Sequence, residues 1–412
     1  MSYSITGLDG RWSAVSHAEE AADLALESRT DAGPDRYAFA TGDGVCSPDA
    51  FRPAELLLAE TLWDRSPGRL LVPEANYGVV GTLLVDAVAE VTMIESSARA
   101  AALCRRNASR NRADASVSLL GELDSVGEAS VAADDSLGGG PPFDDVAYAP
   151  KPYTPIAVGR QRIADAIELL APGGRCFVAA EPTTGLARYR ETLASIAGEV
   201  ETVAERDGAA VVAVSRPASI DPPQFVEPRV LEPSVGGDSE GVSLELVSVP
   251  GRFAAAGLDH GTRLLLDALE VADGDRVLDV CCGYGPIGTY AAATADCSVV
   301  LTDDDRVATR CAECSLQRTD LADGSETTVV TGDCTEAVAD RTFDLVATNP
   351  PTHAGSGVLA ELFAGIDDVL APGGECLFVR HEALDLSGHL RSFQTVETVA
   401  TGEEHVVRRA VP

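Results

Sequence analysis

Short apolar runs alternate with helical patterns along most of the 412-residue chain. We expect strands at Arg276–Val280, Ser298–Thr302, Thr327–Thr331, Phe343–Ala347 and Glu375–Val379, and helices at Ile287–Ala295, Arg306–Thr319 and Leu359–Leu370. Strands that alternate with helices form a mainly parallel, doubly wound sheet, so the pattern predicts an α/β fold. Ligands of such sheets bind beyond the carboxyl ends of the strands.

The chain also matches itself when one half is laid on the other. An offset of 207 residues aligns Gly44 with Gly251, Tyr77 with Tyr284, Gly78 with Gly285, and Gly81–Thr82 with Gly288–Thr289. An offset of 200 aligns Phe143–Ala147 with Phe343–Ala347, Ala171–Gly174 with Ala371–Gly374, and Cys176 with Cys376. Matches in this order predict two copies of one fold. We expect a first domain at 1–215, a proline- and glycine-rich linker at 216–242, and a second domain at 243–412 that opens with an extended lead-in over 242–249.

The charge of the chain is strongly negative. It carries 65 Asp and Glu against 31 Lys and Arg, for a net charge of −34, and Lys151 is its one lysine. Hydrophobic residues make up 45% of the chain, which is enough to build folded cores. The composition resembles that of proteins from extreme halophiles, where molar salt screens charges within about 3 Å. The charge therefore does not exclude a nucleic-acid partner.

The sequence shows neither an export signal nor a membrane span. The N-terminal segment lacks a basic start and an apolar run. The most apolar stretch, Val79–Ile94, is interrupted by Asp86 and Glu90. Ten cysteines without an export signal indicate reduced thiols. We expect a soluble cytoplasmic protein without a membrane partner, and we favour a monomer.

A glycine-rich motif follows the first expected strand of the second copy. Gly283 and Gly285 permit a tight turn and a close approach of the backbone to a ligand, and Gly288 lets helix pack on strand. Asp303 follows at the end of the next strand and suits a ribose diol. This spacing is shared by sites for NAD and for S-adenosylmethionine. Asp279, before the glycines, could meet a cationic amino group, which NAD lacks.

The sequence N-P-P-T-H, residues 349–353, follows the strand that ends at Ala347. Asn349 offers a side-chain carbonyl and Pro350 a main-chain carbonyl in a stiff backbone. Two fixed acceptors can hold a planar exocyclic NH2 group and point its lone pair at an electrophile. Methylation of an amino group needs this arrangement, and hydride transfer does not.

With these motifs, the chain resembles the Rossmann-like methyltransferases that act on exocyclic amino groups. It is most similar to the ribosomal RNA guanine-N2 methyltransferases, the group that includes methyltransferase C of the small ribosomal subunit and methyltransferase G of the large one. The likeness rests on residues 251–266, on N-P-P-T-H, and on the two-copy arrangement with an eroded first copy. It covers about 245–412 clearly and 40–215 mainly in architecture. The resemblance implies two tandem Rossmann-like methyltransferase domains, the first degenerate, with S-adenosylmethionine as cofactor and ribosomal RNA as partner.

The resemblance also implies roles for individual residues. It assigns Asp279, Gly283 and Gly285 to S-adenosylmethionine, Asp303 to the ribose, Asp333 to the adenine, and Phe253, Asp259 and Gly261 to the methionine end. Asn349 and Pro350 would grip the guanine amino group, and Pro351 and His353 complete the catalytic motif. The family usually has an aromatic residue, which stacks on the target base, where this chain has Thr352. No metal is expected, because the pair Cys311 and Cys314 has no second pair of matching spacing.

The first copy is eroded at the corresponding positions. Asn76 replaces the first glycine, Val72 stands in place of Asp279, and A-P-K-P (149–152) replaces N-P-P-T, while Glu95 still resembles Asp303. We expect this copy to support the fold and to help hold RNA. The arginine-rich stretch 105–112 is either an RNA-binding patch or a solvated helix end.

The expected reaction is the methylation of guanine N2 in ribosomal RNA by S-adenosylmethionine. Three alternatives stay open: methylation of a protein glutamine, methylation of a small-molecule amine, and a non-catalytic RNA-binding role in ribosome assembly. The target nucleotide, the choice between the small and large ribosomal subunits, and the choice between naked RNA and an assembled particle also stay open.

Overall fold

Each half of the chain folds around its own mainly parallel sheet, as the alternation of strands and helices predicted. The computed structural model describes residues 10–15, 23–65, 68–120, 142–221, 223–236 and 241–412. Within these, one unit ends at Val226 (unit 1) and the second runs from Glu227 to Pro412 (unit 2). Residues 1–9, where we expected no export signal, and Pro222 and Gly237 of the expected linker lie outside the described residues. No described helix is long and apolar enough to cross a membrane.

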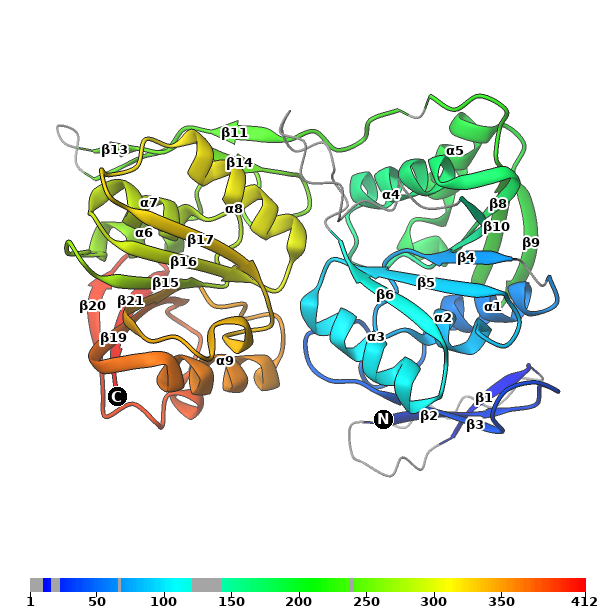
Figure 1. Ribbon diagram of the computed structural model, residues 1–412, viewed down its shortest axis with the longest axis horizontal. Helices are drawn as coiled ribbons and strands as arrows, with labels where there is room; N and C mark the ends of the chain where they lie inside the picture. The colour runs from blue at the N-terminus through cyan, green and yellow to red at the C-terminus, as the bar shows by residue number, and fades with distance from the viewer. Residues whose placement is uncertain (1–9, 16–22, 66–67, 121–141, 222, 237–240) are drawn as a thin grey trace. The chain divides into compact units, whose positions relative to one another are not determined.

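The described part of unit 2 contains a seven-stranded sheet. Its strand order is β17 (Glu326–Thr331), β16 (Ser298–Asp303), β15 (Arg276–Val280), β18 (Phe343–Thr348), β19 (Leu370–His381), β21 (His405–Val411) and β20 (Thr395–Thr401). The strands from β17 to β19 are parallel, and β21 runs antiparallel to both of its neighbours. The helices are α6 (His260–Ala268), α7 (Pro286–Thr294), α8 (Arg306–Arg318) and α9 (Ser356–Val369), and α9 covers the face opposite α7 and α8 (Figure 1). The chain order reverses between β15 and β18, which marks this edge as the expected ligand site.

The described part of unit 1 repeats this topology strand for strand. The order is β6 (Ala115–Leu119), β5 (Glu90–Glu95), β4 (Arg69–Val72), β7 (Phe143–Tyr148), β8 (Leu170–Ala180), β10 (Ala209–Ser215) and β9 (Glu201–Arg206). The helices α1 (Pro53–Trp63), α2 (Val79–Leu84) and α3 (Ala98–Arg110) cover one face, and α4 (Ile156–Glu168) and α5 (Leu186–Ala197) cover the other (Figure 1). A small antiparallel sheet that the sequence did not predict precedes them, with strands β1 (Trp12–Val15), β2 (Asp23–Ser28) and β3 (Arg36–Ala40).

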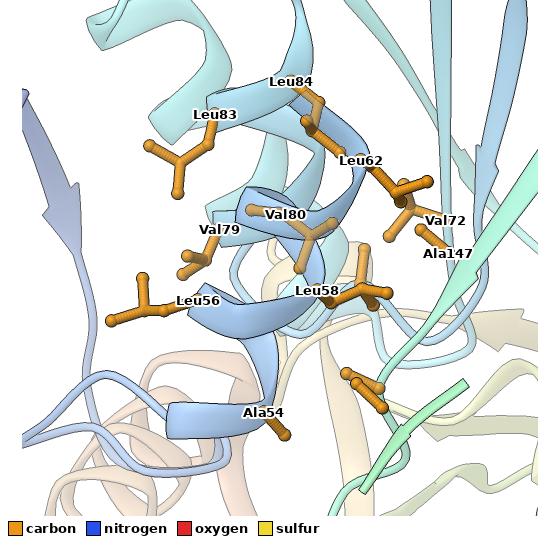
Figure 2. Packing of buried hydrophobic residues seen from close by; sticks show 14 of the residues in the cluster. Ala54, Leu56, Leu58, Leu62, Val72, Val79, Val80, Leu83, Leu84 and Ala147 are labelled. Carbon is orange, nitrogen blue, oxygen red and sulfur yellow. The ribbon is translucent and has the colours of Figure 1, made fainter. Parts of the chain in front are cut away.

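Alternating side chains of the unit 1 sheet enter two separate cores. Val146 packs among residues on the α4 and α5 face, whereas Ala147 packs on the α1 and α2 face. Figure 2 shows Leu62 of α1 beside Val72 and Ala147. Leu62 is fully buried, and burial of such a side chain stabilises the fold by about 1.5–3 kcal/mol. This period of two explains why the strands read as apolar runs.

One strand begins earlier than the sequence predicted. We expected a strand at Glu375–Val379, but β19 begins at Leu370 and includes the Pro-Gly-Gly segment. The register shifts between Phe343 and Leu345, so the extra residues form a bulge. Gly374 fits there because a Cβ atom would lie 2.9 Å from the Phe343 carbonyl oxygen. Proline and glycine usually signal a turn, and in this case they mark a bulge inside a strand.

The segment before the second copy pairs with residues of the expected linker. Strand β14 (Leu246–Ser248) pairs with β11 (Arg229–Leu231), and β13 (Val242–Ser243) pairs with β12 (Ser234–Val235). Parts of 216–242 therefore pack with unit 2.

In each unit, the segment that precedes the sheet is held by the equivalent helix, α8 in unit 2 and α3 in unit 1. In unit 2, the Val247 N–H donates to Ser315 Oγ over 2.9 Å. At the corresponding position of unit 1, the Ala40 N–H donates to Asn107 Oδ1 over 2.7 Å. The likeness between the units thus extends from topology to individual hydrogen bonds.

Candidate active site

The glycine-rich loop between β15 and α7 passes through three left-handed residues. Their φ angles are 60° at Cys281, 56° at Gly283 and 83° at Gly285. Gly285 is required by space as well, because a Cβ atom would lie 2.9 Å from the Cβ of Ala312. At Gly283 no described atom lies within 4 Å of the same position. The loop is therefore packed against α8 at Gly285 and open to a ligand at Gly283.

Asp279 lies fully buried in β15 beneath this loop. Its Oδ2 accepts a 2.7 Å hydrogen bond from the N–H of Gly288 in the first turn of α7. Its Oδ1 is buried and has no hydrogen-bond partner among the described residues. Burial, opposed by the Gly288 hydrogen bond and assisted by nearby Asp303, raises the pKa of Asp279 to about 8. A cationic group placed at Oδ1 would lower that pKa and satisfy the atom.

Asp303, the last residue of β16, holds the loop from the other side. Its Oδ2 accepts from the Gly283 N–H over 2.9 Å, and its Oδ1 accepts from the Asp305 N–H over 2.9 Å. Burial raises the pKa of Asp303 to about 7; the Gly283 hydrogen bond opposes this rise, Asp304 adds to it and Arg252 opposes it. Arg252 itself forms an ion pair with Asp305. The rim of the loop is thus rich in carboxylates, which favours a cationic ligand over an anionic one.

Asn349 follows β18, the strand next to β15. Ala347 of β18 lies opposite Asp279 in the parallel pairing, so both loops leave the sheet side by side. Asn349 Nδ2 donates to Asp259 Oδ2 over 3.3 Å and to Thr262 Oγ1 over 3.0 Å. Both amide hydrogens thus have acceptors on the first turn of α6. The side-chain carbonyl Oδ1 is the part of this amide left to accept a hydrogen bond from a ligand.

The rest of the N-P-P-T-H segment forms a tight turn. The Pro350 carbonyl accepts from the Thr352 N–H over 2.9 Å, and the Pro351 carbonyl accepts from the Ala354 N–H over 2.9 Å. A carbonyl oxygen has two lone pairs, so the Pro350 carbonyl retains one acceptor site. His353 is exposed. Together, Asn349 Oδ1 and the Pro350 carbonyl can accept both hydrogens of a planar NH2 group.

Four further residues that the sequence singled out lie on nearby segments. Asp333 is half-buried after β17, in a loop whose Gly332 N–H donates to the Asp303 carbonyl over 2.9 Å. Phe253 is 65% exposed in the loop before α6. Asp259 caps α6 through a 3.0 Å bond from the Thr262 N–H. Gly261 is buried, and a Cβ atom there would lie 2.9 Å from His405 Cδ2, so it lets α6 approach the sheet.

Sequence reasoning missed two residues of this region. Thr262 holds the Asn349 amide, and Arg252 pairs with Asp305 beside the glycine loop. Both lie inside the segment 251–266 that carries the family resemblance, so that segment was the available signal. Cys311 and Cys314, the pair that the sequence singled out, are both buried on α8.

In unit 1 the chain's own side chains fill the corresponding site. Glu74, Asn76 and Gly78 have φ angles of 52°, 59° and 89° and so repeat the left-handed turn of the second copy. Asn76 is fully buried where Gly283 is open. Its amide donates to the Cys46 carbonyl over 2.9 Å and accepts from the Cys46 N–H over 3.0 Å. The space that is open in unit 2 is therefore taken up by a side chain in unit 1.

Two cations complete this self-filled site. Lys151 Nζ lies 2.9 Å from Glu95 Oε1, and both side chains are at least 90% buried. Arg52 Nη2 donates to the carbonyls of Ala149 and Pro150 over 3.1 and 2.5 Å. Since Pro150 corresponds to Pro350, the guanidinium sits on the counterpart of the carbonyl proposed to bind an amino group. The residues that would hold a cofactor and an amine thus already have internal partners.

The arginine-rich stretch 105–112 has a structural role at several positions. Arg110 pairs with Asp23 over 2.5 Å, and Arg105 donates to the Val117 carbonyl over 3.3 Å. Asn107 and Asn111, between the arginines, bind the backbone of β3. The stretch therefore ties α3 to its neighbours, and its exposed arginines remain candidates for contact with RNA.

A family model described as "Methyltransferase small domain" matches residues 36–213 and 243–409 of this chain. The Ribosomal RNA small subunit methyltransferase C of Pseudoalteromonas atlantica is 28% identical over 263 residues, which cover 62% of this chain and 73% of that protein. The Ribosomal RNA large subunit methyltransferase G of Streptomyces griseus is 34% identical over 175 residues, 41% of this chain and 45% of that protein. The second alignment thus spans less than half of the relative.

One solved structure aligns with nearly the whole chain. It is a 16S rRNA N2 methyltransferase of T. thermophilus in complex with AdoMet and guanosine. The alignment covers 97% of this chain and 98% of that one, with a TM-score of 0.73 and 22% identity. At this identity the likeness concerns the fold, including the presence of both units.

Proposed function

Since the chain belongs to the methyltransferase small domain family, we propose that unit 2 transfers a methyl group from S-adenosylmethionine to N2 of a guanine in ribosomal RNA. The observation that carries this proposal is the fixed orientation of the Asn349 amide beside the glycine-rich loop. The names of the relatives, which are methyltransferases of small- and large-subunit ribosomal RNA, support the choice of substrate. A ribosomal RNA substrate also supports the cytoplasm as the compartment.

The residues of unit 2 fit S-adenosylmethionine. Asp279 Oδ1 is a buried carboxylate oxygen without a partner among the described residues, and it suits the ammonium group of the methionine moiety. Asp303 suits the ribose diol, and Gly283 leaves open space for close approach. Asp333 lies near Asp303 and is our candidate for the adenine.

The same residues disfavour NAD. A pyrophosphate binds the free N–H groups at a helix N-terminus. In this chain the Asp279 carboxylate already accepts from Gly288 in the first turn of α7. A second anion there would meet the carboxylates of Asp279 and Asp303, so the glycine motif supports a cationic cofactor.

The chain's own groups would act by positioning the methyl acceptor. Asn349 Oδ1 and the Pro350 carbonyl accept hydrogen bonds from the two N–H groups of the amino group. They thereby direct the lone pair of its nitrogen away from both acceptors. As the nitrogen gains positive charge, both hydrogen bonds strengthen and stabilise that charge. S-adenosylmethionine, when bound, would supply an electrophilic methyl group, and its sulfur would keep the electron pair of the broken S–CH3 bond and leave as a thioether. After the transfer, the acceptor nitrogen loses a proton to solvent. Before the reaction, a guanine within folded RNA must turn out of its stack.

Unit 1, by the same reasoning, holds no cofactor. Lys151, Asn76 and Arg52 occupy the groups that would bind a cofactor and an amine. We propose that unit 1 instead stabilises the fold and contributes to RNA binding. The chain should therefore bind one S-adenosylmethionine, and calorimetry counts the sites directly. Two sites per chain would contradict this role for unit 1.

The proposed reaction is tested with Asn349→Ala. Ribosomal particles and naked ribosomal RNA are incubated with the protein and labelled S-adenosylmethionine, and N2-methylguanosine is measured by mass spectrometry. We expect kcat to fall by about 100-fold or more, with an unchanged Kd for S-adenosylmethionine. The matched control is Gln394→Ala, which removes an exposed carboxamide from the same unit. Full activity in Asn349→Ala would exclude a role of the Asn349 amide in holding the amino group.

The alternatives give different results in the same experiment. Methylated glutamine in ribosomal proteins, with unmodified RNA, would indicate a protein substrate. Label in small amines alone would indicate a small-molecule enzyme. RNA binding without any methylation by the wild type would indicate an assembly factor. The comparison of RNA with protein substrates is informative because this chain has Thr352 where an aromatic residue would stack on the target base.

A further inference from the structure

We propose that Thr262 and Asp259 are positioning residues that set the direction of the Asn349 amide. This inference rests on the proposed function and adds to it how the Asn349 amide is held in position. A carboxamide can turn by 180° about its last bond, and the two orientations exchange a donor for an acceptor. Only one orientation presents Oδ1 to the N–H groups of an amino substrate. The reaction therefore requires something that distinguishes the two ends of this amide.

Asp259 supplies that distinction. An ionised carboxylate is an acceptor only, so its Oδ2 can bind Nδ2 of Asn349 and would repel Oδ1. The same Oδ2 accepts from the Thr262 N–H over 3.0 Å, which fixes the carboxylate as the N-cap of α6. The orientation of the amide is thus tied to the start of a helix that packs against the sheet.

Thr262 binds the second hydrogen of the amide. Its Oγ1 lies 3.0 Å from Nδ2, and its side chain is 4% exposed, so water does not readily replace it. With both amide hydrogens engaged by α6, Oδ1 must face the other way. A hydroxyl at this position serves Asn349 alone among the side-chain contacts in the described residues.

Unit 1 changes the three corresponding positions together. Arg52, Glu55 and Ala149 stand where unit 2 has Asp259, Thr262 and Asn349. There is no amide to orient, and Arg52 instead pairs with Glu55 over 3.3 Å and binds the Ala149 carbonyl. A purely structural helix cap would be expected to persist in both units, since α1 and α6 occupy the same place. The joint loss is consistent with a role toward Asn349.

Thr262→Val and Thr262→Ser provide the first test. Valine keeps the shape and removes the hydroxyl, and serine keeps the hydroxyl. We expect kcat for guanine methylation to fall about tenfold in Thr262→Val and to recover to at least half in Thr262→Ser, with unchanged Kd for S-adenosylmethionine in both. Thr289→Val is the matched control, because the buried Thr289 hydroxyl has no partner among the described residues.

Asp259→Asn provides the second test. The new amide can present either end to Asn349, so both orientations of Asn349 become accessible. We expect a larger fall in kcat than in Thr262→Val and an unchanged Kd for S-adenosylmethionine. A rise of that Kd would instead assign Asp259 to the methionine end of the cofactor and overturn the inference.

The two levels of the proposal fail in different ways. If the wild type methylates no guanine, the proposed function is wrong, and the inference falls with it. If the wild type is active and Thr262→Val matches Thr289→Val, the function stands and the positioning role is wrong. A tenfold loss that serine restores, with cofactor binding intact, would support both.

Discussion

Replacing Lys151 by methionine tests whether the self-filled site of unit 1 stabilises that unit. Lys151 is the chain's one lysine, and its ammonium lies 2.9 Å from Glu95 Oε1. The side chains are 8% and 1% exposed. Methionine has a similar length and no charge, so Lys151→Met keeps most of the packing and leaves the Glu95 carboxylate buried without its cation.

The expected cost follows from the burial of both groups. Removing one partner of a buried ion pair destabilises a protein by about 3–5 kcal/mol, because the remaining charge is stranded. With a urea dependence of about 2 kcal/mol per molar, the unfolding midpoint should fall by about 2 M. The double variant Lys151→Met/Glu95→Gln should recover at least half of the loss, since no charge is then stranded.

Tryptophan fluorescence measures this effect in unit 1 alone. The chain has two tryptophans, Trp12 and Trp63, and both lie in unit 1 with ring centroids 5.4 Å apart. Arg188→Met is the control, because it removes an exposed cation from the same unit. If Lys151→Met unfolds at the same urea concentration as Arg188→Met, the buried pair contributes little, and our account of unit 1 is wrong.

Three further predictions concern pH and salt. S-adenosylmethionine should bind at least tenfold more tightly at pH 7.5 than at pH 6, because Asp279 and Asp303, with pKa values of about 8 and 7, are mostly protonated at pH 6 and ionise as pH rises, while an α-amino group with a pKa of about 8 is still mostly charged at pH 7.5; calorimetry at both pH values measures this, and an equal Kd would refute it. In unit 1 the pKa of Glu74 is about 2, because Arg162, Lys151 and Thr154 together outweigh the raising effect of burial. A lowered pKa in the folded state contributes stability above the unfolded value of 4.5 that is lost as pH falls toward 2, on the order of 3 kcal/mol; Glu74→Gln should remove this acid dependence from the fluorescence transition. With a net charge of −34, the unfolding midpoint should fall as KCl is lowered from about 1 M to 0.1 M, since the screening length rises from about 3 to 10 Å; a midpoint independent of KCl would show that the surface charge does not govern stability.

Local patterns predicted the elements that build the sheet. The strand Arg276–Val280 was predicted at its observed bounds, because a buried parallel strand is a short apolar run between polar ends. The internal repeat predicted a second copy of the same topology, and both sheets have it. The strand β19 begins five residues before its predicted start, because the Pro-Gly-Gly bulge has the composition of a turn.

The sequence by itself determined the fold class, the glycine-rich loop and the amide at the end of β18. The fold class and the loop follow from residues that are neighbours in the chain. The place of the amide follows because the carboxyl ends of parallel strands meet at one edge of the sheet. The tertiary structure alone decided which side chains hold that amide and which fill the site of unit 1. Asn349 and Thr262 are 87 residues apart, and Lys151 and Glu95 are 56 apart. No local pattern encodes such pairs. They form only after the sheet has brought its strand ends and the first turn of a helix to within hydrogen-bond distance.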